Sequence, residues 1–298
     1  MRIGIALGGG GARGWAHIGV LRTLERAGFE PTIIAGTSIG AIVGGAYAAG
    51  KLDELEKFAL GLDRRTAWKL ADLNLGKGGG LVVGDKVAQA LLDIIGDVAI
   101  SDLKKKFTAV ATELLTGHEV WLEEGNLSTA MRASYALPGI LVPVELDGRY
   151  LIDGGITNPV PVSACRAMGA QFVIAVPVPA SQSPNQRFAR EPVPEAEGSA
   201  WQKALAVFRE PERFVARQLF GDEPGELTTA TVSVAALNIL LDRMTRVRLA
   251  SDPPDVTINS DIGKIAILEF DRADEAIAIG AAATERVLPE IEARVART

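Results

Sequence analysis

A stretch of twenty residues without a charge, from Pro31 to Gly50, most restricts what this chain can fold into. Its length is about that of a helix that crosses a bilayer. However, Gly36, Gly40 and further glycines, together with the polar pair Thr37 and Ser38, divide it into a short strand, a sharp turn and a helix of small residues. We therefore expect this stretch in the core of a globular protein and not in a membrane.

The first sixty residues alternate between predicted strands and helices, as parallel α/β folds do. Strands are predicted at Arg2 to Leu7 and Thr32 to Ala35, and helices at Trp15 to Gly28, Ser38 to Ala49 and Asp53 to Leu60. Further strands are predicted at Phe107 to Thr112, His118 to Glu123, Tyr150 to Ile152, Gln171 to Pro177, Asp255 to Ile258 and Ala266 to Phe270. Further helices are predicted at Trp201 to Phe220, Val232 to Val247 and Ala273 to Ala293.

The 298 residues are 48% hydrophobic, which is enough to bury a substantial core. Residues 180–228 begin and end with polar stretches rich in Ser, Pro, Gln and Glu. We interpret them as a flexible or lid-like insertion. The chain is thus expected to form one domain, residues 1–298, with a core at 2–178 and with helices and strands at 229–298 that complete it.

Charge and cysteine content narrow the class of protein. The formal net charge is −6, and the longest run of basic residues is Lys104 to Lys106, so a nucleic-acid partner is not expected. The single cysteine, Cys165, excludes an intramolecular disulfide and a multi-cysteine metal site. The first fourteen residues have no long apolar segment typical of a signal peptide, and a cytoplasmic location is expected.

A G-x-S-x-G motif places Ser38 between the second strand and the second helix. Gly36 and Gly40 permit the strained turn that exposes a nucleophilic hydroxyl, and the helix amino terminus favours the negative charge that develops in acyl transfer. The alternative is a plain helix cap, which serine also provides.

A glycine run, Gly8 to Gly14, follows the first strand. Its amides are able to converge on an anion and so form an oxyanion hole beside Ser38. The run also contains G-x-G-x-x-G, the dinucleotide-binding pattern. That pattern requires an acidic residue at the end of the second strand, where this chain has GTSIG, so we favour the oxyanion role.

The third motif is Asp153 with Gly154 and Gly155, after the apolar strand at Tyr150. Taken alone, this motif fits a turn aspartate better than a catalytic one. The only histidines are His17, one turn into a helix, and His118, in an expected hairpin, and we interpret both as structural. A Ser-Asp dyad is therefore favoured over a Ser-His-Asp triad.

These motifs, in this order, resemble those of the bacterial patatin-like phospholipases, close to the branch that includes the catalytic domain of neuropathy target esterase. The resemblance covers Arg2 to Val178 and includes a fourth block, Arg132 to Gly139, similar to the R-A-S-x-x-x-P block of the family. Many members have aspartate or serine where this chain has Gly8.

The resemblance implies a three-layer α/β/α sandwich with a mostly parallel central sheet. It implies hydrolysis of fatty-acyl esters of phospholipids or lysophospholipids, without calcium or another cofactor. Ser134 and Pro138 would have structural roles. The implied site consists of the nucleophile Ser38, its partner Asp153, the oxyanion loop Gly9, Gly10, Gly11, Arg13 and Gly14, the elbow glycines Gly36 and Gly40, and the supporting Gly154 and Gly155.

Several alternatives stay open at this point. The same acyl-serine chemistry serves transacylases and thioesterases, and a silent hydrolase scaffold serves as a lipid- or protein-binding regulator. Trp201 to Phe220 resembles an interfacial helix for peripheral membrane contact, and packing on the core or on a second subunit is the alternative. Head group, acyl length and oligomeric state are left open.

Overall fold

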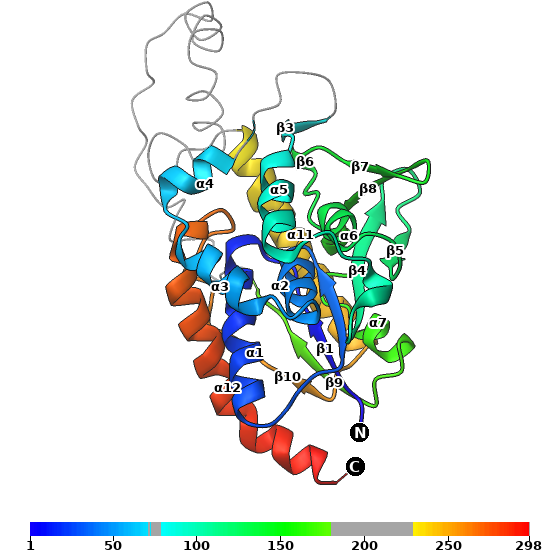
Figure 1. Ribbon diagram of the computed structural model, residues 1–298, viewed down its shortest axis with the longest axis vertical. Coiled ribbons are helices and arrows are strands. Elements are labelled where there is room, and N and C mark those ends of the chain that lie inside the picture. The colour runs from blue at the N-terminus through cyan, green and yellow to red at the C-terminus, as the bar shows by residue number, and fades with distance from the viewer. Residues whose placement is uncertain (71, 73–78, 180–228, 298) are drawn as a thin grey trace, which may run out of the picture. The chain divides into compact units, whose positions relative to one another are not determined.

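The structure is a computed structural model that describes residues 1–70, 72, 79–179 and 229–297 (Figure 1). One compact unit comprises Met1–Ala180 and Leu241–Thr298, and a second comprises Ser181–Leu240. The predicted insertion at 180–228 and the predicted helix Trp201 to Phe220 lie outside the described residues. All that follows on the sheet and the site concerns the first unit.

Strands and helices alternate along most of the chain. The strands are β1 (Ile3–Leu7), β2 (Ile33–Thr37), β3 (Gly80–Val82), β4 (Lys106–Glu113), β5 (Glu119–Leu122), β6 (Gly139–Leu141), β7 (Val144–Leu146), β8 (Arg149–Asp153), β9 (Phe172–Val176) and β10 (Val256–Thr257). The α-helices are α1 (Ala16–Arg26), α2 (Ile39–Ala48), α3 (Leu52–Leu60), α4 (Arg64–Leu70), α5 (Asp85–Ile95), α6 (Leu127–Ser134), α7 (Val162–Ala167), α11 (Thr229–Ser251) and α12 (Ala273–Val295). The 3₁₀ helices are η1 (Gly11–Trp15), η2 (Ile100–Asp102), η3 (Gly154–Ile156) and η4 (Phe270–Arg272).

Eight strands form the main sheet, in the order β10-β9-β1-β2-β4-β8-β7, with β5 paired to β4. The five strands from β10 to β4 are parallel, and β5, β7 and β8 are antiparallel to their neighbours. A separate two-stranded sheet joins β3 to β6. The mostly parallel sheet confirms the first part of the fold prediction.

Both faces of the central strands are buried, which is why these strands are continuously apolar. Ile5, Leu7 and Ile174 face the larger hydrophobic cluster, which also contains residues of α1, α2 and α12. The alternate residues Ala6 and Val173 face a smaller cluster that contains apolar side chains of α7. Helices therefore cover both faces of the sheet, and the predicted three-layer sandwich is confirmed (Figure 1).

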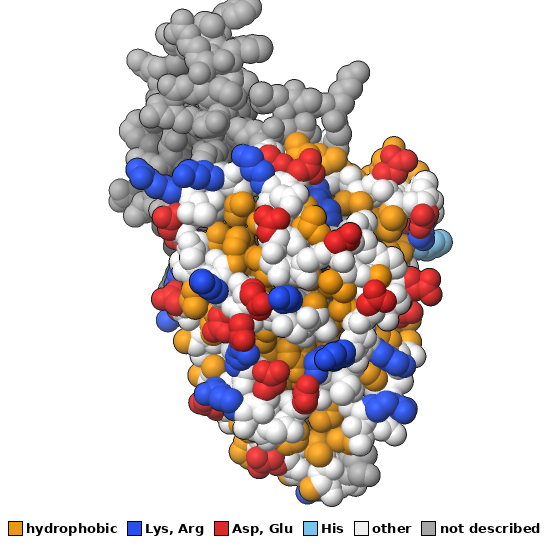
Figure 2. Space-filling model, viewed as in Figure 1, with side chains coloured by type: hydrophobic (Ala, Val, Ile, Leu, Met, Phe, Trp, Pro, Cys, Tyr) orange, Lys and Arg blue, Asp and Glu red, His pale blue; other side chains and the backbone are white. Residues whose placement is uncertain are grey.

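The uncharged stretch at Pro31 to Gly50 becomes β2, a turn and α2, all within this core, as expected. Among the described residues, no helix has the length and apolarity needed to cross a membrane. On the face drawn in Figure 2, acidic and basic side chains are interspersed and do not gather by sign.

One predicted strand is wrong. The segment Ala266 to Phe270 forms turns that lead into η4. The Glu269 carboxylate accepts a hydrogen bond from the Ala266 amide at 2.7 Å, which closes the turn locally. The carbonyl of Ile267 accepts from the amide of Ala12, so this segment packs on the glycine run and does not join the sheet. An apolar run that is buried under a loop resembles a strand in sequence.

Candidate active site

Ser38 occupies a strained turn between β2 and α2. Its φ of 57° is rare for a residue with a side chain and is typical of a nucleophile elbow. The turn needs glycine at both flanking positions, because a Cβ on Gly36 would lie 2.4 Å from the Gly40 carbonyl and a Cβ on Gly40 would lie 2.1 Å from the Leu7 carbonyl. Ser38 remains partly exposed while both of its neighbours are buried.

Strand β4 aligns Ser38 with Asp153. On one edge of β4, Thr37 of β2 pairs with Val110, and Asp153 of β8 pairs with the next residue, Ala111. The opposite edge of β4 is taken by β5, which pairs with both of these residues. The end of β2 and the end of β8 therefore meet head to head. The Ser38 hydroxyl donates to Oδ2 of Asp153 at 2.6 Å, so the structure brings the predicted dyad together.

Asp153 is 3% exposed, and burial raises the pKa of its carboxyl group to about 6. Two hydrogen bonds partly oppose that rise, one from the Ser38 hydroxyl and one from the Gly155 amide to Oδ1 at 2.7 Å. The supporting glycines are explained by close packing, since a Cβ on Gly154 would lie 2.1 Å from the Val110 carbonyl. A carboxylate with this pKa is ionised at neutral pH and more basic than an ordinary aspartate.

The predicted oxyanion loop passes next to Ser38, since a Cβ on Gly9 would lie 3.2 Å from Cβ of Ser38. The amide of Gly9, one of the predicted donors, donates to the Pro159 carbonyl at 3.0 Å. Among the described residues, we find no acceptor for the amides of Gly10 and Gly11. Within the described part of the chain, the amides of Gly10 and Gly11 therefore have hydrogens that no protein carbonyl accepts.

The glycine loop is also held by contacts of three nearby residues, Arg13, Gly14 and His17. Nε of Arg13 donates to the Gly10 carbonyl at 3.1 Å. A Cβ on Gly14 would lie 2.1 Å from Cγ2 of Ile39, so glycine lets η1 pack against α2. His17 is fully buried, and its Nε2 lies 2.8 Å from the Gly8 carbonyl. Burial lowers the pKa of His17 to about 4, so its imidazole is neutral at neutral pH.

Neither histidine is hydrogen-bonded to Ser38 or Asp153 within the described residues, and His118 is exposed in the turn before β5. The same part of the chain also has no group of three or more His, Cys, Asp or Glu side chains arranged to hold a metal ion.

Two polar contacts of the elbow were not assigned from the motifs. The amide of Ser38 donates to Oγ of the buried Ser134 at 2.9 Å, and that hydroxyl donates to the Val110 carbonyl at 2.6 Å. The hydroxyl of Thr37 donates to the Asn158 carbonyl at 2.8 Å. Ser134 belongs to the R-A-S block and Asn158 precedes two prolines, so the sequence marks both residues without indicating their partners.

A family model described as patatin-like phospholipase matches residues 5–166. An uncharacterized NTE family protein of Mycobacterium tuberculosis is 35% identical over 333 residues, which cover 98% of this chain and 92% of that protein. The lysophospholipase nte1 of Emericella nidulans is 31% identical over 191 residues, which cover 59% of this chain and 12% of that protein.

Among solved structures, VipD from Legionella pneumophila matches with a TM-score of 0.51 at 15% identity, over 97% of this chain and 66% of that chain. At this identity the likeness concerns the fold alone. The family model covers more than half of the chain, and the mycobacterial relative aligns over nearly all of it. The chain therefore belongs to the patatin-like phospholipase family, among its members related to NTE.

Proposed function

We propose that this protein is a serine acyl hydrolase that cleaves fatty-acyl esters of phospholipids or lysophospholipids through an acyl-enzyme on Ser38. Family membership supports a lipid ester hydrolase in general. The observation that carries the finer proposal is the hydrogen bond of 2.6 Å between the Ser38 hydroxyl and the buried carboxylate of Asp153.

The proposed reaction has two halves. Asp153 accepts the proton of Ser38 as Oγ attacks the ester carbonyl, and it returns that proton to the leaving alcohol. Water then attacks the acyl-serine and Asp153 accepts its proton. As the bond between the acyl carbon and Oγ of Ser38 breaks, Asp153 returns the proton to Oγ, and the fatty acid leaves. In both halves the carbonyl oxygen becomes an oxyanion, for which the free amides of Gly10 and Gly11 are the proposed donors.

The test uses purified protein with a fluorophosphonate probe and with phospholipid, lysophospholipid and soluble p-nitrophenyl ester substrates. Ser38→Ala is expected to abolish labelling and to reduce ester turnover by about 10⁴- to 10⁶-fold, because it removes the nucleophile. His118→Ala is the matched control and should retain full activity, since this side chain is exposed and outside the site. Probe attached to another serine, or activity retained in Ser38→Ala, would contradict the proposal.

A further inference from the structure

The loop that follows β8 contacts three parts of the site. Asp153, the last residue of β8 and the start of this loop, accepts a hydrogen bond from the Ser38 hydroxyl. The carbonyl of Asn158 accepts from Thr37, the residue before the nucleophile, and the carbonyl of Pro159 accepts from the Gly9 amide. The conformation of residues 153–159 therefore fixes the carboxylate, the elbow and the glycine loop relative to one another.

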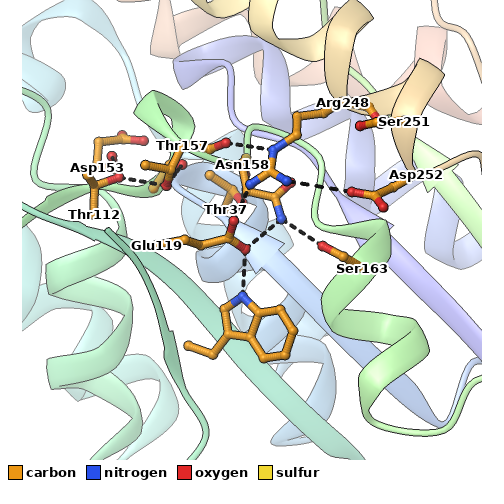
Figure 3. A network of polar contacts seen from close by, with 12 residues as sticks. Thr37, Thr112, Glu119, Asp153, Thr157, Asn158, Ser163, Arg248, Ser251 and Asp252 are labelled. Carbon is orange, nitrogen blue, oxygen red and sulfur yellow. Dashed lines mark hydrogen bonds and ion pairs between the residues drawn. The ribbon is translucent and has the colours of Figure 1, made fainter. Parts of the chain in front are cut away.

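Arg248 of α11 holds this loop from outside the site (Figure 3). Its Nε donates to the Thr157 carbonyl at 2.8 Å, and its guanidinium pairs with Glu119 of β5. A second ion pair joins Arg248 to Asp252 on the same helix at 3.6 Å. One planar side chain thus binds the loop, the sheet and its own helix, which a lysine with a single charged nitrogen does not reproduce.

Glu119 completes the attachment. Its Oε2 accepts a hydrogen bond from the Arg248 guanidinium. Its Oε1 accepts hydrogen bonds from Nδ2 of Asn158 at 2.7 Å and from Nε1 of Trp121 at 2.6 Å. Asn158 also donates to Oγ of Ser163 at 3.0 Å. Figure 3 shows these side chains converging on the loop from β5, α7 and α11. The loop is therefore bound at the backbone carbonyl of Thr157 and at both the side-chain amide and the backbone carbonyl of Asn158.

Partial burial makes the Arg248–Glu119 pair more effective than an ordinary surface pair. The two side chains are 26% and 18% exposed. Water screens charges at such a place less than at the surface, and removing one partner leaves the other charge unpaired. The helix also packs over the loop, because a Cβ on Gly155 would lie 3.1 Å from Leu241.

We infer that Arg248 and Glu119 are positioning residues for the proposed hydrolysis: together they hold residues 154–159 so that Asp153 meets Ser38. This inference rests on the proposed function and adds two residues to it. Neither side chain is hydrogen-bonded to Ser38 or Asp153, so neither is a catalytic residue.

The test compares Arg248→Ala with Arg246→Ala. Arg246 lies on the same helix, and its side chain is 57% exposed. Its one ion pair among the described residues is with Asp242, one turn away, so it is a matched control. For a soluble ester, Arg248→Ala should lower kcat by about 10- to 100-fold with KM within about threefold, because the base is misplaced while no residue at the nucleophile is changed. Fluorophosphonate labelling of Ser38 should slow by a similar factor. Arg246→Ala should change kcat by less than about twofold.

Two further variants separate positioning from folding. Arg248→Lys should recover part of the lost kcat, and Glu119→Gln, which keeps the shape but removes the charge, should lower kcat with little change in KM. Hydrogen exchange of the peptide that covers residues 153–159 should be about tenfold faster in Arg248→Ala than in Arg246→Ala. This readout does not require any enzymatic activity.

The outcomes are distinguishable. Unchanged kcat and unchanged exchange in Arg248→Ala would overturn the inference and leave the proposed function intact. An equal loss of activity in Arg248→Ala and Arg248→Lys, together with a lower melting temperature and exchange raised across the whole chain, would mean that the pair is only structural. If wild-type Ser38 does not react with the probe, the proposed function fails, and the exchange experiment still decides whether Arg248 holds the loop.

Discussion

At the scale of single residues, the site depends on a carboxylate that is costly to bury. Asp153 is nearly inaccessible, and among the described residues only the Ser38 hydroxyl and the Gly155 amide donate hydrogen bonds to its carboxylate oxygens. The pKa of about 6 follows from this imbalance. The carboxyl group of Asp153, the proposed base, therefore loses its proton just below neutral pH.

The pH profile of ester hydrolysis should show this pKa. The proposed base works only when it is ionised, so kcat/KM should fall about tenfold per pH unit below pH 6 and be constant between pH 7 and 8. The profile of His118→Ala should be the same as that of the wild type. An acid limb near pH 4, the value of an ordinary aspartate, would contradict the predicted burial effect.

Burial of this charge should also reduce stability. The pKa of Asp153 is higher in the folded state than in the unfolded state, so its contribution favours folding at low pH and is lost as the pH rises through about 6. Asp153→Asn keeps the shape and has no charge. At pH 8 it should raise the free energy of unfolding by on the order of 2 to 3 kcal/mol, and at pH 4 by much less.

Urea unfolding of wild type and Asp153→Asn at the two pH values measures this difference. The Asn variant should also have no esterase activity. A variant that is less stable than wild type at pH 8 would show that the ionised carboxylate is better solvated than its burial indicates.

At the scale of secondary-structure elements, the close packing of α1 against α12 restricts two positions to glycine. Helices α1 and α12 cross at two glycines: a Cβ on Gly19 would lie 2.0 Å from the Ile277 carbonyl, and a Cβ on Gly280 would lie 2.0 Å from the Ala16 carbonyl. Both obstacles are backbone atoms, so the helices would have to move apart to admit a methyl group.

Gly280→Ala should therefore destabilise the fold by roughly 1 to 3 kcal/mol, although alanine is the better helix former. Ala278→Ser, at an exposed position of the same helix, is the control and should change stability little. Thermal unfolding followed by circular dichroism measures both. A higher melting temperature for Gly280→Ala would mean that the two helices have room to separate.

The sequence predicted those elements whose pattern is local. The central strands are recognisable because both of their faces are buried, and the elbow because its glycines flank the serine in order. Short strands such as β3, β6 and β7 have three residues each, too few for a pattern, and were not predicted. The contact of Arg248 with Glu119 spans 129 residues, and no local pattern encodes it.

The hydrogen bonds of the glycine loop also depend on residues far away in the sequence, so local patterns do not predict them. Its glycines predicted an anion site, but which amides are free depends on the carbonyls of Pro159 and Ile267, which come from distant segments. The oxyanion loop stays a prediction, and the amide of Gly9, one of its predicted donors, is hydrogen-bonded to the Pro159 carbonyl.

At the scale of the whole molecule, the family match is shorter than the folded unit. It ends at residue 166, before β9 and β10. Yet β9 pairs directly with β1, on the edge opposite to β2. Helix α12 packs along α1, and α1 contributes Ile18 and Leu21 to the core. The segments outside the match complete the sheet and one of its helical layers.

A chain that ends at Arg272, and so lacks α12, should lose its fixed core, because it exposes the buried face of α1. We expect loss of the near-ultraviolet circular dichroism signal and aggregation in size-exclusion chromatography. A chain that ends at Val295 retains the whole helix and should behave as the 298-residue chain does. A monomeric, ester-cleaving chain without α12 would contradict the prediction.

The head-to-head meeting of β2 and β8 on β4 also has a consequence for the order of events during synthesis. The two partners of the dyad are 115 residues apart in the chain. A nascent chain released only as far as Val110 contains the complete elbow but no base, and the base arrives only when β8 pairs with β4. Contacts of such long range form late, because a large loop must close first. Under the proposed mechanism, the newly made enzyme therefore stays inactive toward lipids until β8 has paired with β4.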